Sequence, residues 1–136
     1  MIWAFIIIFT LLVALFYLFP IIQVCGDSMC PTFNDGDIVI GCRIFKLKLG
    51  DVYIFNPPVG QENEKRYFVI KRVLHIIVEQ PKKHHHKNKY GFYGDVKVFF
   101  VGDNSAVSFD SRNYGTVEAK KILAKYLFTI HRKRKK

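Results

Sequence analysis

The chain opens with an uncharged apolar segment and continues as short runs of alternating character. No side chain within residues 1–26 carries a charge, and residues 2–19 are almost entirely apolar. A helix of about 20 apolar residues spans roughly 30 Å, the thickness of the hydrocarbon core of a bilayer. Trp3 and Tyr17 occupy positions typical of aromatic residues at a membrane interface. This pattern predicts a transmembrane anchor over residues 1–23.

A cleavable signal peptide is the alternative interpretation of this segment. A signal peptide begins with basic residues and ends at a small-x-small cleavage site, and the chain has neither feature here. The residues before Cys25 are Ile22-Gln23-Val24, which lack the small side chains of a lipoprotein cleavage site. We therefore expect a retained anchor. The first basic residue is Arg43, so the distribution of positive charge does not decide which side of the membrane the domain faces.

Beyond the apolar segment, β-branched and aromatic runs alternate with turn residues such as Asn34-Asp35-Gly36. The last run, residues 117–130, fits a strand or an amphipathic helix equally well. Short strands of this kind build a mostly-β domain, a small folded sheet or partly open β-barrel. We expect this domain to cover residues 24–130, followed by a basic tail, residues 131–136. The predicted strands cover residues 37–40, 51–55, 67–77 and 96–101.

Composition limits the ligands that the chain is expected to use. The formal net charge of +10 favours an anionic partner, either nucleic acid or an acidic lipid surface, although a basic tail can also be simply solvated. Cys25, Cys30 and Cys42 are odd in number and lack the spacing of a zinc site. The three histidines at 84–86 are consecutive and cannot all point at one ion, so we expect a solvated loop. No metal or cofactor is expected.

Ser28 is a candidate nucleophile because it lies in a tight bend framed by glycine and proline, within Gly26-Asp27-Ser28-Met29-Cys30-Pro31. A serine hydroxyl is a weak nucleophile, so it needs a base close by to take its proton. Two thiols flank it, those of Cys25 and Cys30, and either is a rival nucleophile. No histidine has the spacing that would favour a catalytic triad.

Lys71 is a candidate base because it interrupts an apolar run, Phe68-Val69-Ile70-Lys71-Arg72-Val73-Leu74. Alternation along a strand puts Lys71 on one face and Arg72 on the other. Burial lowers the pKa of lysine from about 10.4 by ~3–5 units, which leaves a neutral amine that accepts a hydroxyl proton. The alternative is a surface strand with two ordinary charges. The pattern alone leaves both interpretations open.

Three motifs in order resemble those of type I signal peptidases, membrane-bound serine proteases with a Ser–Lys pair. The first surrounds Ser28, the second is Lys71-Arg72-Val73, and the third is Gly102-Asp103-Asn104 followed by Ser108-Phe109-Asp110-Ser111-Arg112 and Gly115. The resemblance covers the chain from Met1 to about Leu123. It is closest to the compact single-domain members of that family.

The resemblance implies a role for each matching residue. Ser28 would be the nucleophile and Lys71 the general base, and Ser108 would orient the lysine amine. The backbone N–H of Ser28 would donate to the oxyanion. The supporting ion pairs would be Asp110 with Arg112 and Asp103 with Arg72. Four residues would form the walls of pockets for small side chains at the −1 and −3 positions of the substrate: Val24, Met29, Phe33 and Ile70.

The implied function is a membrane-bound endopeptidase that cleaves signal peptides from exported preproteins at small-x-small sites. Its partners would be preprotein signal peptides and the lipid bilayer, not nucleic acid, with the catalytic domain on the extracytoplasmic or lumenal side. Residues 74–81 depart from the Gly-x-Pro-Gly-Asp turn of bacterial members and look more like archaeal and endoplasmic-reticulum relatives, in which histidine replaces the lysine. This leaves substrate range and additional membrane subunits open.

Two alternative functions remain. One is a dedicated processing peptidase of the same family, such as a pilin-maturation enzyme of a conjugation system. The other is a basic, membrane-tethered binding module without catalysis, which would leave the Lys71 strand and the third motif unexplained.

Overall fold

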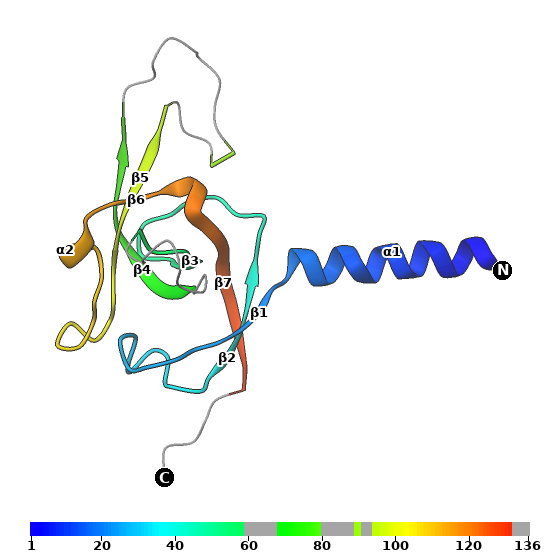
Figure 1. Ribbon diagram of the computed structural model, residues 1–136, viewed down its shortest axis with the longest axis horizontal. Helices are drawn as coiled ribbons and strands as arrows, with labels where there is room; N and C mark the ends of the chain where they lie inside the picture. The colour runs from blue at the N-terminus through cyan, green and yellow to red at the C-terminus, as the bar shows by residue number, and fades with distance from the viewer. Residues whose placement is uncertain (59–67, 80–88, 91–93, 132–136) are drawn as a thin grey trace.

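One antiparallel sheet organises the computed structural model, which describes residues 1–58, 68–79, 89–90 and 94–131. In these ranges the strand order is β1-β2-β7-β3-β4-β5-β6, and the sheet curls around its own core (Figure 1). The prediction of a mostly-β domain is confirmed. The strands are β1 (Ile21–Gln23), β2 (Ile38–Cys42), β3 (Val52–Phe55), β4 (Val69–Val78), β5 (Val96–Val101), β6 (Val117–Glu118) and β7 (Ile122–His131). The helical elements are α1 (Ile2–Leu18), α2 (Ser111–Tyr114) and the 3-10 turn η1 (Ala119–Lys121).

The N-terminal helix α1 is shorter than the predicted anchor over residues 1–23. It has 17 residues and ends at Leu18. Pro20 disfavours a helical conformation at Phe19, and the chain then enters β1, which pairs with β2 through Ile21–Ile40. Over the described ranges, no helix is both long and apolar enough to cross a membrane. The prediction of a transmembrane helix at the N-terminus is therefore wrong for this structure.

The strands follow the alternation of the sequence. β2 and β5 alternate between buried and half-buried residues, as expected for strands with one face on the core. All four residues of β3 are buried, because the sheet curls and apolar side chains cover both faces of this strand. The ambiguous segment 117–130 forms mainly β7, which pairs with β2 on one side and β3 on the other. Those two partners resolve the choice between strand and helix.

Two predicted segments lie partly or wholly outside the described residues. They are the three histidines at 84–86 and residues 132–136 of the basic tail. His131, the expected start of that tail, is the last residue of β7.

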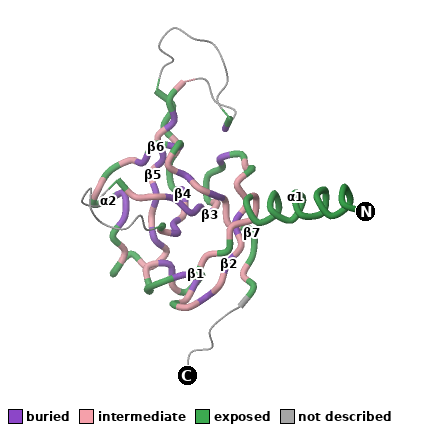
Figure 2. The backbone as a smooth tube through the Cα atoms, turned by 45° about the vertical axis from the view of Figure 1, so that its right-hand side comes forward, coloured by how far each residue is buried: buried purple, intermediate pink, exposed green. Residues whose placement is uncertain are grey.

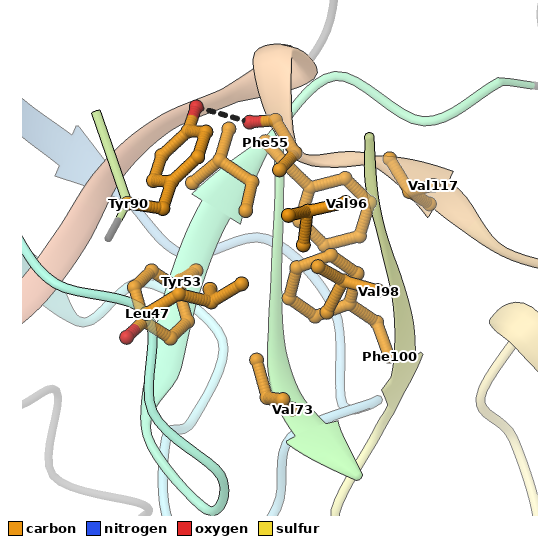
Figure 3. Close-up of a cluster of buried hydrophobic side chains, with 11 residues drawn as sticks. Leu47, Tyr53, Phe55, Val73, Tyr90, Val96, Val98, Phe100 and Val117 are labelled. Carbon is orange, nitrogen blue, oxygen red and sulfur yellow. Dashed lines mark hydrogen bonds between the residues drawn. The ribbon is translucent and has the colours of Figure 1, made fainter. Parts of the chain in front are cut away.

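The larger apolar cluster fills one side of the curled sheet (Figure 3). Its centre is the stacked pair Phe55 and Phe100, whose ring centroids lie 4.0 Å apart. At its margin the Tyr90 hydroxyl donates to the Ala119 carbonyl at 2.5 Å, so the buried phenol keeps a hydrogen-bond partner. This cluster is the main source of hydrophobic stabilisation of the domain.

A second apolar cluster lies beneath the segment that carries Ser28. Met29 and Phe33 from that segment pack against β3 and β4 residues, including Ile54 and Ile70. The ring of Phe33 meets that of Tyr126 edge to face, with centroids 4.8 Å apart. These contacts attach the Ser28 segment to the sheet.

Replacing Phe100 with alanine should lower the free energy of unfolding by about 3–5 kcal/mol, because it removes a buried ring and leaves a cavity beside Phe55. Urea or thermal unfolding would measure this. The control is Phe128→Ala, at a β7 position that is 52% exposed, which should change stability by no more than about 0.5 kcal/mol. Equal losses in both variants would contradict the proposed core.

Candidate active site

The Ser28 segment joins β1 to β2 and is fixed by its own backbone. Val24 donates to the Asp37 carbonyl and accepts from Gly36, both at 2.8 Å. Gly36 has a φ of 87°, which favours glycine at this turn. The side chain of Asp37 is fully buried and accepts from the Asn34 N–H at 3.0 Å. No role was predicted for Asp37, although a carboxylate directly after an Asn-Asp-Gly turn is a usable signal in the sequence.

Lys71 projects from β4, opposite Tyr53 in β3. The residue is only 4% exposed, and its Nζ lies 2.5 Å from the Oγ of Ser28, 43 positions earlier in the chain. Burial lowers the pKa of the Lys71 amine, the carboxylates of Asp110 and Asp103 oppose this, and the guanidinium of Arg112 reinforces it. The structure therefore joins the candidate nucleophile and the candidate base in one hydrogen bond.

Asp110 lies buried behind this pair as an acceptor of several hydrogen bonds. The guanidinium of Arg112 reaches it with two N–H groups, at 2.9 and 2.7 Å, and the Gly102 N–H donates at 2.9 Å. Burial alone would raise the pKa of Asp110, but the hydrogen bonds from Arg112, Ser108 and the backbone outweigh it and hold the pKa well below its usual range. Asp110 also caps α2 through the Arg112 N–H.

The hydroxyl of Ser108 has Asp110 as its hydrogen-bond acceptor. It donates to Asp110 at 2.6 Å, and no hydrogen bond within the described ranges joins it to Lys71. The buried carboxylate is a stronger acceptor than a neutral amine, because hydrogen bonds to a charged group are the stronger ones. A hydroxyl that donates to Asp110 can still accept a hydrogen bond, so the orienting role of Ser108 stays a prediction.

Asp103 links the Ser28 segment to the sheet. It receives two hydrogen bonds from Arg72, at 2.8 and 2.6 Å, and one from the Thr32 hydroxyl at 2.5 Å. Arg72 also donates to the Gly50 carbonyl at 2.8 Å. The hydrogen bond from Arg72 lowers the pKa of Asp103, and burial opposes this. Thr32 was missed in the sequence, because its partner lies 71 positions away.

Asn104 holds the peptide unit that precedes the Ser28 side chain. Its side-chain amide donates to the Asp27 carbonyl at 3.1 Å, and the Cys30 N–H donates to the same oxygen at 3.1 Å. The Asn104 N–H donates to the Ser28 carbonyl at 3.0 Å. In a trans peptide the C=O of Asp27 and the N–H of Ser28 point in opposite directions. Fixing that carbonyl therefore also fixes the direction of the Ser28 N–H.

The expected pocket residues are all buried. Val24, Met29 and Phe33 are 3% exposed or less, Ile70 is 9% exposed, and all four belong to the second apolar cluster. Three of them belong to the Ser28 segment, and Ile70 lies in β4 directly before Lys71.

The Cys30 thiol donates to Asp27 Oδ1 at 3.3 Å, whereas the Ser28 hydroxyl lies 2.5 Å from the amine of Lys71. The geometry therefore favours Ser28 over Cys30 as the nucleophile.

Across the described ranges, no group of three histidine, cysteine, aspartate or glutamate residues could hold a metal ion.

Known proteins resemble this chain over most of its length. The family model described as signal peptidase, peptidase S26, matches residues 1–76 and 79–131. The chain belongs to this family. It is also 32% identical, over 124 residues, to the mitochondrial inner membrane protease subunit 1 of Schizosaccharomyces pombe. That match covers 84% of this chain and 74% of the relative, so the peptidase S26 assignment extends over the sheet and all three motifs.

Replacing Gly102 with alanine should disturb the Ser28 segment. A Cβ at this position would fall well inside van der Waals contact with the Ser28 carbonyl oxygen and the Ser108 side chain, so the backbone must shift. We expect the free energy of unfolding to fall by about 1–3 kcal/mol, as for other overpacked sites. Urea denaturation would measure this. Ser105→Ala, at an exposed position of the same segment, is the control and should be nearly neutral. Equal stability of the two variants would rule out the tight contact at Gly102.

Proposed function

We propose that this protein is a membrane-associated serine endopeptidase that removes N-terminal signal peptides, with Ser28 as nucleophile and Lys71 as general base. The observation that carries the proposal is the 2.5 Å contact between Lys71 Nζ and Ser28 Oγ, made by a lysine that is 4% exposed. Burial favours the neutral amine, which has a lone pair to accept the hydroxyl proton.

The proposed reaction uses these groups in sequence. The Lys71 amine takes the proton of Ser28 as Oγ attacks the scissile carbonyl carbon of the preprotein. The Ser28 N–H, held in direction by Asn104, donates to the oxyanion that forms. The ammonium of Lys71 then gives its proton to the leaving amine. Water, deprotonated by the same amine, hydrolyses the acyl-enzyme.

Substrate preference is proposed from the apolar residues around the nucleophile. Val24, Met29, Phe33 and Ile70 would form shallow walls that accept small side chains at the −1 and −3 positions, which selects small-x-small sites. An extended substrate segment would pair with the protein backbone beside Ser28.

Membrane association is proposed on two grounds. The S. pombe relative is named as an inner membrane protease subunit. In this chain, α1 carries no charged side chain, and its residues are exposed from Ile2 to Tyr17. The name of the relative, a protease subunit, also supports a second candidate, a dedicated processing peptidase that works beside another subunit.

The deciding experiment compares cleavage of a preprotein with an Ala-x-Ala site by the wild type, Ser28→Ala and Lys71→Ala. We expect kcat to fall by about 10⁶-fold in either variant, the scale observed when a protease loses its nucleophile or its base. Ser105→Ala is the matched control and should retain full activity, because its side chain is exposed.

Each other outcome has a defined meaning. Full activity of a folded Lys71→Ala protein would refute the dyad, and equal cleavage by wild type and Ser28→Ala would refute the nucleophile. A folded wild type that cleaves only one native substrate, or only beside a partner subunit, would favour the dedicated processing peptidase. Absence of cleavage together with tight salt-dependent binding would favour the non-catalytic module.

Activity should rise with pH through the pKa of Lys71, because only the neutral amine accepts the serine proton. That pKa lies below the ordinary 10.5, since burial lowers it. Between the folded and unfolded pKa values the unfolded chain binds more protons, so stability should also rise with pH in that window. A pH profile of kcat/KM, paired with urea denaturation of wild type and Lys71→Met, would test both effects. A profile with its midpoint at or above 10.5 would contradict the buried neutral base.

A further inference from the structure

The C-terminal end of α1 borders a basic hollow of about 460 Å³. The cations around it come from separate parts of the chain, and none of its described lining residues is acidic. Two aromatic side chains, Tyr17 and Phe68, also line it. The cations are Arg43, Lys89, Lys120 and Lys121.

Arg43 has an unsatisfied hydrogen-bond donor among the residues that line this hollow. Its guanidinium lies over the ring of Tyr17, 4.5 Å from the centroid, and the backbone N–H of Arg43 donates to the Leu18 carbonyl at 3.0 Å. Its Nε is buried and has no hydrogen-bond partner among the described residues. An unsatisfied buried donor is costly, so an acceptor oxygen from a ligand would stabilise it.

The other cations are partly engaged by the protein. Lys120 pairs with Glu118 at 2.5 Å, and the Lys89 ammonium lies 4.9 Å from the centroid of the Tyr90 ring. Lys121 lies half-buried at the end of η1, directly before β7. The remaining positive charge suits an anion such as a phosphate group.

A second hollow, of about 260 Å³, lies between the same end of α1 and the sheet. Among the described residues, only apolar side chains line it, from α1 and its C-cap, from the edge strand β1 and from its neighbour β2: Leu12, Leu15, Phe16, Phe19, Ile21 and Ile40. Phe16 in this hollow and Tyr17 in the basic one are consecutive residues, so one turn of α1 contributes to both. From this end back to its N-terminus, α1 is an exposed helix without charged side chains (Figure 2).

We propose that the junction of α1 with β2 binds an anionic phospholipid. The phosphate occupies the basic hollow and receives a hydrogen bond from Arg43 Nε, and an acyl chain lies along the apolar hollow. Free phosphate would leave the apolar hollow unused, and nucleic acid would engage a longer row of cations along its backbone. Because Ser28 and Lys71 line neither hollow, this inference is independent of the proposed catalysis.

The test measures sedimentation of the full chain with vesicles of phosphatidylcholine alone or mixed equally with phosphatidylglycerol. The double variant Arg43→Gln/Lys121→Gln should bind the mixed vesicles roughly 25-fold more weakly, from about 1 kcal/mol for each cation near an anionic surface. The matched control, Lys46→Gln/Lys48→Gln, loses the same charge from the neighbouring β2–β3 connection, outside both hollows, and should lose no more than about threefold.

A soluble probe distinguishes a phospholipid from a free phosphate. We expect dihexanoyl-phosphatidylglycerol to shift the Arg43 Nε–H resonance at concentrations where glycerol phosphate does not. Equal potency of the two probes would overturn the lipid assignment in favour of a small anion, and equal losses in both double variants would mean diffuse attraction without a site. If the Arg43 variant does not fold, Lys121→Gln alone, with about a fivefold loss expected, serves with the same control.

Discussion

The burial of one lysine is the constraint on which the rest of the site depends. Lys71 emerges from a strand in the middle of an antiparallel sheet, where a full charge is costly and a neutral amine is not. Its amine meets Ser28, which the β1–β2 connection brings over the same sheet. Met29 and Phe33 anchor that connection through apolar packing. The apolar packing therefore also holds Ser28 beside the amine of Lys71.

The two carboxylates nearest to this lysine have arginine partners. Unpaired, Asp103 and Asp110 would stabilise an ammonium on Lys71 and raise its pKa. Arg72 and Arg112 instead form two-point ion pairs with them, and burial remains the leading influence on the pKa of the amine. Such pairs need not stabilise the fold to matter for the chemistry.

Local pattern predicted the parts of the structure that depend on local physics. Alternation located β2, β3, β4 and β5, and the three motifs located the residues that meet at the site. The helix boundary was wrong because strand pairing of residues 21–23 competes with continuation of the apolar helix. The partner of Ser108, and the contacts of Thr32 and Asn104, depend on distances across the fold that no short window contains. The pairing of β7 with both β2 and β3 also joins residues that lie far apart in the sequence.

The place of β7 in the sheet has a consequence for biosynthesis. It lies between β2, on the serine side, and β3, on the lysine side, although it is the last strand of the described chain to be made. While residues 122–131 are still inside the ribosome, the two halves of the described sheet lack their shared partner. Ser28 and Lys71 are then joined through the packing of Met29 and Phe33 and through the loop contacts of residues 102–104, without the strand that lies between β2 and β3. The strand that joins the serine side of the sheet to the lysine side is thus the last of the described strands to be translated.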